Sequence, residues 1–182
     1  MAFCIWVTGL PGSGKSTISR ELREELGKNG TGVEILRLDE LRKILTPKPE
    51  YTQKERDIVY RTLTATAAAL TKNRINVIID ATANRREYRD LAREHIKNFA
   101  EIYIECPLEV CIERESGRKD DLVTKNLYKK ALEGGDIVGE LPGINAPYEA
   151  PGDAEVIIPS DKISPKEASL EIKGFLGKRG WI

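Results

Sequence analysis

Short apolar runs alternate with longer amphipathic segments along this chain. The run at 3–8 ends at a glycine and is typical of a strand buried on both faces. The run at 76–80 is rich in β-branched residues, which also favours a strand. We predict three further strands, at 33–38, 101–105 and 154–158, so that strands are spread over the whole chain.

The segments between these runs have the spacing of helices. Ile18, Leu22 and Leu26 recur every four residues with charged residues between them. Thr52 and Glu55 form a capping box that opens a long helix to about residue 72. Other helices are expected at 40–45, 86–98, 107–114 and 127–132, and after the N-terminal signal Ser164-Pro165-Lys166-Glu167. This alternation predicts an α/β fold, a mostly parallel five-stranded sheet with helices on both faces, as one domain over residues 1–182.

The charge balance and the cysteine count narrow the class of protein. The 182 residues include 29 basic and 29 acidic side chains, so the net charge gives no bulk attraction to nucleic acid or anionic lipid. Three cysteines, an odd count, argue against a disulfide framework and for a reducing compartment. The apolar runs are far shorter than the roughly 20 residues of a membrane helix, and residues 1–7 lack the basic region of a signal peptide. We therefore expect a cytoplasmic protein without a membrane or nucleic-acid partner.

One motif points to phosphate binding. The glycines of such a motif let successive amide groups turn toward phosphate oxygens, and the helix that follows adds positive potential. Lys15 is placed to bridge the β- and γ-phosphates of ATP, and the Ser16 hydroxyl to ligate Mg²⁺. The alternative is a glycine-rich turn that fits by chance, but the predicted strand and helix flank the motif as a P-loop requires. The residues that match G-x-x-x-x-G-K-[ST] are Gly9, Leu10, Pro11, Gly12, Ser13, Gly14, Lys15 and Ser16, with Thr17 after them.

Other segments separate the classes of P-loop protein. A GTPase reads guanine with an N/T-K-x-D segment, and the nearest candidates, at 71–74 and 124–127, both lack the aspartate. The charged stretch at 116–124, within a lid region around 114–132, suits a small-molecule kinase. A lid excludes water that would compete for the γ-phosphoryl group. The sequence therefore predicts a kinase.

Two aspartates follow predicted strands, and ligands of such folds bind at the carboxyl ends of the strands. Asp39 is placed to act as general base on an acceptor hydroxyl or as an outer partner of Mg²⁺, and its alternative role is the N-cap of the next helix. Asp80 is placed to hold a Mg²⁺-bound water, and its alternative is a capping or turn aspartate. Together with Ser16, these residues form the candidate metal set.

An anionic acceptor requires cations and, if it is a nucleotide, an aromatic surface on which the base can stack. Tyr51 is the natural stacking residue. His95 is expected on the surface and the cysteines in the packed interior, because none has partners at metal-binding spacing. For each candidate cation, a solvated helix face is an equally good explanation. These candidates are Arg42, Arg56, Arg61, Arg86, Arg89, Lys129 and Lys130.

Beyond the P-loop, several segments resemble the adenylylsulfate (APS) kinase family, whose members transfer the γ-phosphate of ATP to the 3′-hydroxyl of adenylylsulfate. The most specific are residues 127–131, Leu-Tyr-Lys-Lys-Ala, and 142–151, Pro-Gly-Ile-Asn-Ala-Pro-Tyr-Glu-Ala-Pro, while 9–17 and 107–111 also match. The resemblance implies a homodimer, with Asp39 as the base beside Arg42 and with Arg114 in a lid over ATP. It implies an acceptor pocket formed by Tyr51, in place of a stacking phenylalanine, together with Arg56, Lys129, Leu141 and Ile144.

The chain departs from the family pattern at several positions. Leu36-Arg37-Leu38-Asp39 stands where the family has L-D-G-D, and Leu141 replaces a second stacking phenylalanine. Residues 77–84, Val-Ile-Ile-Asp-Ala-Thr-Ala-Asn, look more like the V-I-x-D-A-T-N segment of kinases that act on polynucleotide 5′-hydroxyls, seryl-tRNA or small metabolites. An APS kinase is the leading hypothesis, a kinase of another hydroxyl acceptor the second, and a nucleotide-binding module without phosphoryl transfer the third.

Overall fold

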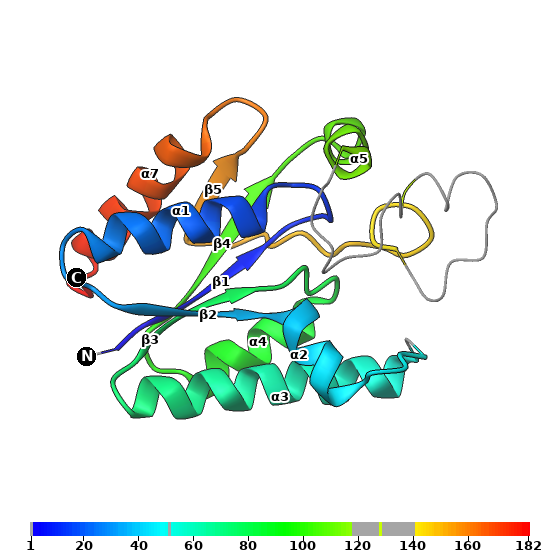
Figure 1. The fold of residues 1–182 in the computed structure, drawn as a ribbon, viewed down its shortest axis with the longest axis horizontal. Helices are drawn as coiled ribbons and strands as arrows, with labels where there is room; N and C mark the ends of the chain where they lie inside the picture. Colours follow the sequence, from blue (N-terminus) through cyan, green and yellow to red (C-terminus); the bar gives the residue numbers. More distant parts are fainter. Residues whose placement is uncertain (1, 51, 118–127, 129–140) are drawn as a thin grey trace.

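The computed structural model describes residues 2–50, 52–117, 128 and 141–182, and its centre is a sheet of five parallel strands (Figure 1). These lie in the order β2-β3-β1-β4-β5, so the first strand of the chain is the middle of the sheet. The predicted α/β fold with a parallel sheet is confirmed. The strands are β1 (Cys4–Thr8), β2 (Val33–Arg37), β3 (Asn76–Asp80), β4 (Phe99–Glu105) and β5 (Val156–Pro159).

Helices cover both faces of the sheet (Figure 1). On one face lie α1 (Lys15–Gly27) and α7 (Pro165–Lys178), packed against each other. On the other lie α3 (Gln53–Lys72) and α4 (Arg86–His95), with α2 (Leu38–Leu45) packed on α3. The helix α5 (Leu108–Ser116) follows β4 at the carboxyl edge of the sheet, where the strand arrows end.

The central strand is buried on both faces, as its apolar run predicts. Ile5 and Val7 pack among the apolar side chains of α1 and α7, whereas Cys4 and Trp6 pack among those of α3 and α4. Successive side chains of a strand point to opposite faces, so a strand with helices on both sides needs apolar residues at every position. The same arrangement leaves the carboxyl ends of the strands as the edge at which polar loops meet.

Helix starts follow the capping signals in the sequence. The Thr52 side chain accepts a hydrogen bond from the Glu55 amide at the start of α3. At α7, Ser164 and Glu167 cap each other reciprocally, with Pro165 in the first turn. Such side chains satisfy amide groups that have no partner within the helix, which fixes where the helix begins.

Several boundaries differ from the sequence prediction. The helix expected at 40–45 begins at Leu38, because Leu38 is buried in the cluster between the sheet and α3. The helix expected to reach residue 98 ends at His95, and β4 begins at Phe99 rather than at 101. Ile96 and Phe99 are both buried in that cluster, and Phe99 pairs in register with Cys4. Burial and strand pairing therefore shorten α4.

The C-terminus of α3 contains a strained arginine that gives a stability prediction. Arg74 has a φ of 65°, and the amides of Arg74 and Ile75 donate to the Thr71 and Leu70 carbonyls, as in a Schellman cap. This left-handed conformation destabilises a residue with a Cβ by roughly 1–2 kcal/mol. We expect Arg74→Gly to raise the free energy of unfolding, measured by urea denaturation, by about 0.5–1 kcal/mol. The gain is smaller than the strain because glycine loses more entropy on folding.

Helix α1 provides the matched control. Gly30, with a φ of 76°, occupies the same position of the same kind of cap, and no atom lies within 4 Å of a Cβ added there. Gly30→Ala is therefore expected to lower the free energy of unfolding by a similar amount. Changes of the same sign in both variants would contradict the assignment of strain to Arg74.

Candidate active site

The P-loop joins the end of β1 to the start of α1 in the expected geometry. Gly12 and Gly14 have φ values of 84° and 100°, a region that favours glycine. A Cβ at Gly12 would overlap the carbonyl oxygen of Cys111 in α5, and one at Gly9 would lie 2.6 Å from the carbonyl oxygen of Ile104 in β4. The loop therefore lies so close to β4 and α5 that only glycine fits at these positions.

Lys15 is buried at the start of α1, with 7% of its surface exposed. Its Nζ donates to the carbonyl oxygens of Gly9 and Leu10 at 3.0 and 2.8 Å. Ser16, the next residue of α1, is half-buried. The ammonium group is thus held against the loop at a helix N-terminus, where the helix dipole and the amide groups also favour an anion.

Distant segments brace the P-loop. The Ser160 hydroxyl, just after β5, donates to the Ser13 carbonyl at 2.7 Å. The Tyr128 hydroxyl donates to the Pro11 carbonyl at 2.9 Å. The Ser13 amide also donates to the Leu10 carbonyl within the loop at 3.1 Å. The loop is therefore fixed by residues that follow it by more than a hundred positions.

Arg114 and Thr17, both predicted to contact ATP, line a cavity of about 440 Å³ beside the P-loop. Arg114 donates to the carbonyl oxygen of Ser160 at 2.8 Å and to its hydroxyl at 3.3 Å, so its guanidinium group is held at the edge of this cavity. The position next to Gly14 makes the cavity our candidate for the nucleoside end of ATP. Its other lining residues are Ile18, Asp161, Lys162, Ile163, Ser164 and Pro165.

The predicted acceptor residues Asp39, Arg42 and Arg56 lie on α2 and α3, within electrostatic range of Tyr60 of α3. Burial raises the pKa of Tyr60, and the charges of Arg42, Arg56 and Asp39 also act on its hydroxyl. Arg56 is buried, and Arg42 Nη1 lies 2.8 Å from a carboxylate oxygen of Glu55. The α2–α3 pair therefore gathers two cations and two carboxylates, those of Asp39 and Glu55, near the carboxyl edge of the sheet.

The alternative role of Asp39 as a helix N-cap is wrong. Arg37 is the N-cap of α2, and Asp39 lies within the first turn. Burial of Leu38 starts the helix before Asp39 and leaves that carboxylate half-buried. Negative charge in a first turn is favourable toward the helix dipole, so this placement also stabilises α2.

Asp80 ends β3 next to the central strand, where its backbone lies in register with Val7. Its carboxylate is almost buried, and Oδ2 lies 3.6 Å from Nε of Arg37, the residue in register with it on β2. Arg37 replaces the first aspartate of the L-D-G-D pattern. The sequence placed both residues at or near the ends of predicted strands, which was the available signal for this ion pair. Sequence reasoning did not use it.

The other residues that the family resemblance implied divide into two groups. Leu141 and Ile144 lie in a small apolar cluster with Leu10 of the P-loop and with Cys106 and Cys111. Tyr51, Lys129 and most of the 114–132 lid region lie outside the described residues. Sequence reasoning also missed Tyr60 and Ser160, although the position of Ser160 directly after the last strand placed it at the same edge.

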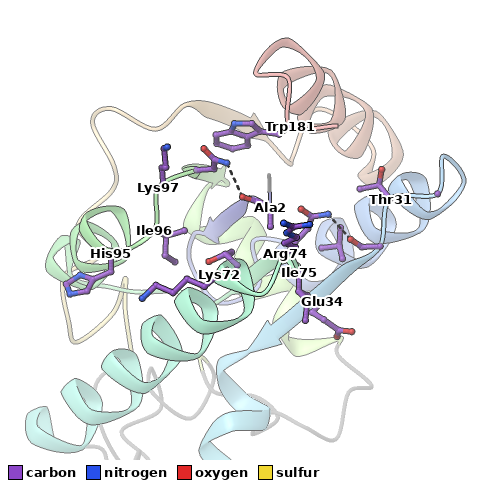
Figure 2. A pocket seen from close by; sticks show the side chains of 16 residues that line it. Ala2, Thr31, Glu34, Lys72, Arg74, Ile75, His95, Ile96, Lys97 and Trp181 are labelled. Carbon is purple, nitrogen blue, oxygen red and sulfur yellow. Dashed lines mark hydrogen bonds between the residues drawn. The ribbon is translucent and has the colours of Figure 1, made fainter.

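A cavity of about 1080 Å³ lies at the opposite edge of the sheet, where the strands begin (Figure 2). Figure 2 shows Lys72, Arg74, His95 and Lys97 around it. These basic residues end or follow α3 and α4, where positive charge complements the helix dipole. The ring of Trp181, also in its wall, already stacks on Phe3. This edge is remote from the P-loop, and we do not place the active site there.

Comparison with known proteins gives one consistent result. The family model for adenylylsulphate kinase matches residues 1–159. A probable adenylyl-sulfate kinase of Archaeoglobus fulgidus is 37% identical over 162 residues, which cover 89% of this chain and 98% of that protein. The adenylyl-sulfate kinase of Halothermothrix orenii is 34% identical over 178 residues, which cover 98% of this chain and 91% of that protein.

A solved structure gives the same likeness in three dimensions. The APS kinase of Mycobacterium tuberculosis, in complex with AMPPNP and APS, matches with a TM-score of 0.83 and 28% identity, covering 97% of this chain and 98% of that one. A sugar kinase from Janibacter matches with a TM-score of 0.70 at 21% identity, over 97% of this chain and 95% of that one, and shows the shared fold alone.

Proposed function

This chain belongs to the adenylylsulfate kinase family, and we propose that it transfers the γ-phosphate of ATP to the 3′-hydroxyl of adenylylsulfate, giving 3′-phosphoadenylylsulfate. The observation that carries the proposal is the whole-length match to a kinase structure that holds both an ATP analogue and APS. In this chain, a P-loop and the Asp39–Arg42–Arg56 group lie at the carboxyl edge of one sheet. A phosphate donor and an anionic acceptor require that combination.

We assign roles to residues by their chemistry. Lys15 and the P-loop amides hold the β- and γ-phosphates and neutralise charge in the transition state. Asp39 orients the 3′-hydroxyl and accepts its proton as the oxygen attacks the γ-phosphorus, and ADP leaves. Arg42 and Arg56 balance the negative charge of adenylylsulfate. Tyr51, Lys129, Leu141 and Ile144 complete the proposed acceptor pocket.

The donors at this edge fit Mg²⁺. The Ser16 hydroxyl and the carboxylates of Asp39 and Asp80 are hard oxygen donors, which Mg²⁺ prefers. In the described parts of the chain, no three His, Cys, Asp or Glu residues gather as a metal site, so phosphates and water would supply the other ligands. Bound there, Mg²⁺ neutralises charge on the β- and γ-phosphate oxygens.

The experiment that tests the function is ADP release measured with and without adenylylsulfate. We expect turnover that depends on adenylylsulfate and on Mg²⁺ and that yields a product phosphorylated at the 3′-hydroxyl. The Arg37–Asp80 ion pair, at a position where the family pattern differs, favours a kinase of another hydroxyl acceptor as the second candidate. Turnover with a nucleoside, an RNA 5′ end or a polyol, and none with adenylylsulfate, would select that candidate and reject the first.

We also propose a homodimer in the cytoplasm. Ile44 and Leu45 on α2 and Ile58 on α3 are exposed, and this is the chemistry of a surface that a second copy covers. All three cysteines are free, in keeping with a reducing compartment. No described helix is both long enough and apolar enough to cross a bilayer. Sedimentation equilibrium of Ile44→Asp against the wild type tests the dimer, and an unchanged dimer would contradict this surface.

A further inference from the structure

Arg89 of α4 is fully buried, although the sequence presented it as one of several possible substrate-binding cations. Its guanidinium group has partners on three sides. Nη1 donates to the carbonyl of Ala83, Nη2 donates to the carbonyl of Glu149 at 2.6 Å, and Nε lies 3.4 Å from the Glu101 carboxylate. A buried guanidinium group is costly unless it is paired, so these contacts account for its position. Arg89 joins two loops and does not reach out toward substrate.

The first of these loops, residues 81–84, follows β3 at the carboxyl edge. Each of its four carbonyl groups accepts a hydrogen bond from a different residue, on β1, on α4 or in the 142–151 segment. The donors are Trp6 Nε1 to Ala81 at 3.0 Å, the Thr8 hydroxyl to Thr82 at 2.6 Å, Arg89 to Ala83, and the Glu149 amide to Asn84 at 2.8 Å. The surroundings therefore determine a single conformation of this loop.

Ala83 is the strained residue of that loop. Its φ is 45°, in the left-handed region that a residue with a Cβ adopts at a cost. Such strain persists where the surroundings impose it, and it concentrates at functional sites. The Ala83 amide donates to the Tyr60 hydroxyl at 3.0 Å, and the charges of Asp39, Arg42 and Arg56 act on this same hydroxyl. The loop held by Arg89 is thus hydrogen-bonded to Tyr60, whose hydroxyl lies within electrostatic range of the proposed acceptor residues.

The second loop, residues 146–149, is part of the 142–151 segment. The Tyr148 hydroxyl lies 2.9 Å from the Thr8 hydroxyl, at the end of the strand that leads into the P-loop. The Glu149 carboxylate accepts from the Arg86 amide at 2.6 Å. The carbonyl of Glu149 is the atom that Arg89 binds. Arg89 therefore joins this segment to loop 81–84, in addition to the direct bond from the Glu149 amide to the Asn84 carbonyl.

We infer that Arg89 is a positioning residue for the acceptor, because its guanidinium fork fixes loop 81–84 and the 146–149 segment as the two walls of the adenylylsulfate pocket. This inference rests on the proposed function and deepens it. Lysine in place of Arg89 keeps a positive charge beside Glu101 but presents a single nitrogen, which lacks the planar fork that reaches both carbonyl groups. Arg89→Lys therefore separates positioning from charge balance.

Helix α4 supplies a matched control one turn further along. Arg93 forms a bidentate ion pair with Glu155, at 2.6 and 3.0 Å, and Glu155 also accepts from the Glu101 amide. This arginine ties α4 to the sheet but does not touch loop 81–84 or the 146–149 segment. Arg93→Lys has the same chemical change at a site without a role in the pocket.

The experiment measures kcat and KM for adenylylsulfate and for ATP, together with Tm, in the wild type, Arg89→Lys and Arg93→Lys. We expect Arg89→Lys to raise KM for adenylylsulfate by about tenfold, the effect of roughly one or two lost hydrogen bonds, with KM for ATP unchanged. Arg93→Lys is expected to change Tm and neither KM. A fall in Tm of Arg89→Lys with KM for adenylylsulfate unchanged would overturn the inference.

A second variant keeps the inference testable if Arg89→Lys fails to fold. Tyr148→Phe removes only the hydroxyl that contacts Thr8 and loosens the same wall without disturbing the buried arginine. We expect it to raise KM for adenylylsulfate in the same direction, and an unchanged KM in both Tyr148→Phe and Arg89→Lys would reject the positioning role. The two proposals fail in different ways. Wild-type enzyme without adenylylsulfate-dependent turnover rejects the function, whereas normal wild-type turnover with unaffected variants rejects only the role of Arg89.

Discussion

Lys15→Met is expected to lower kcat for adenylylsulfate-dependent ADP release by about 1000-fold, the loss typical of removing a preorganised group that stabilises transition-state charge. Methionine fills the volume of the lysine stem but cannot neutralise the phosphate oxygens. We expect the variant to fold, because burial of an ammonium group has a desolvation cost that burial of a thioether does not have. Stopped assays of ADP formation, with circular dichroism of the same samples, measure both properties.

The control for this variant is Lys28→Met. Lys28 lies just beyond the other end of α1, where its exposed ammonium group pairs with the buried carboxylate of Glu25. This pair is far from the P-loop, so wild-type kcat is expected. A Lys15→Met enzyme that keeps most of its kcat would contradict the role of the P-loop lysine in phosphoryl transfer.

Asp39→Asn is expected to reduce kcat by at least about 100-fold, because general-base catalysis contributes typically 10²–10⁴-fold. Asparagine preserves the size of the side chain and its place in the first turn of α2, but it cannot accept the proton of the acceptor hydroxyl. KM for ATP is expected to stay close to the wild-type value, since the P-loop is unchanged. Steady-state kinetics with each substrate varied in turn gives this comparison.

The neighbouring acidic residue offers a control in the same helical turn. Glu40 is exposed and contacts Arg37 at 3.4 Å. Glu40→Gln removes one negative charge near the N-terminus of α2, as Asp39→Asn does. If kcat falls equally in the two variants, the effect comes from the negative charge near the start of α2, and Asp39 is not the base. A loss confined to Asp39→Asn supports the assignment.

Local patterns in the sequence were sufficient for the sheet and for the phosphate end of the site. An apolar run next to a glycine-rich turn places β1 and the P-loop, since these depend on residues close together in the chain. The end of α4 and the start of β4 could not be predicted from local patterns, because burial of Ile96 and pairing of Phe99 with Cys4 determine them. Helix propensity alone does not contain that information.

The acceptor end of the site depends on contacts between distant segments. Arg89 looked like one cation of a polar helix, but its partners Glu101 and Glu149 lie 12 and 60 positions further along the chain. The Arg37–Asp80 pair likewise requires the pairing of β2 with β3. The roles of Tyr51 and Lys129 stay predictions, since both residues lie outside the described part of the chain.

The bond from Ser160 to the Ser13 carbonyl has a consequence for biosynthesis. A chain that emerges from the ribosome N-terminus first presents the P-loop sequence well before the serine that braces it. That serine is translated almost a hundred and fifty residues later. Nascent chains therefore carry the nucleotide-binding motif through the synthesis of all the intervening residues without this support.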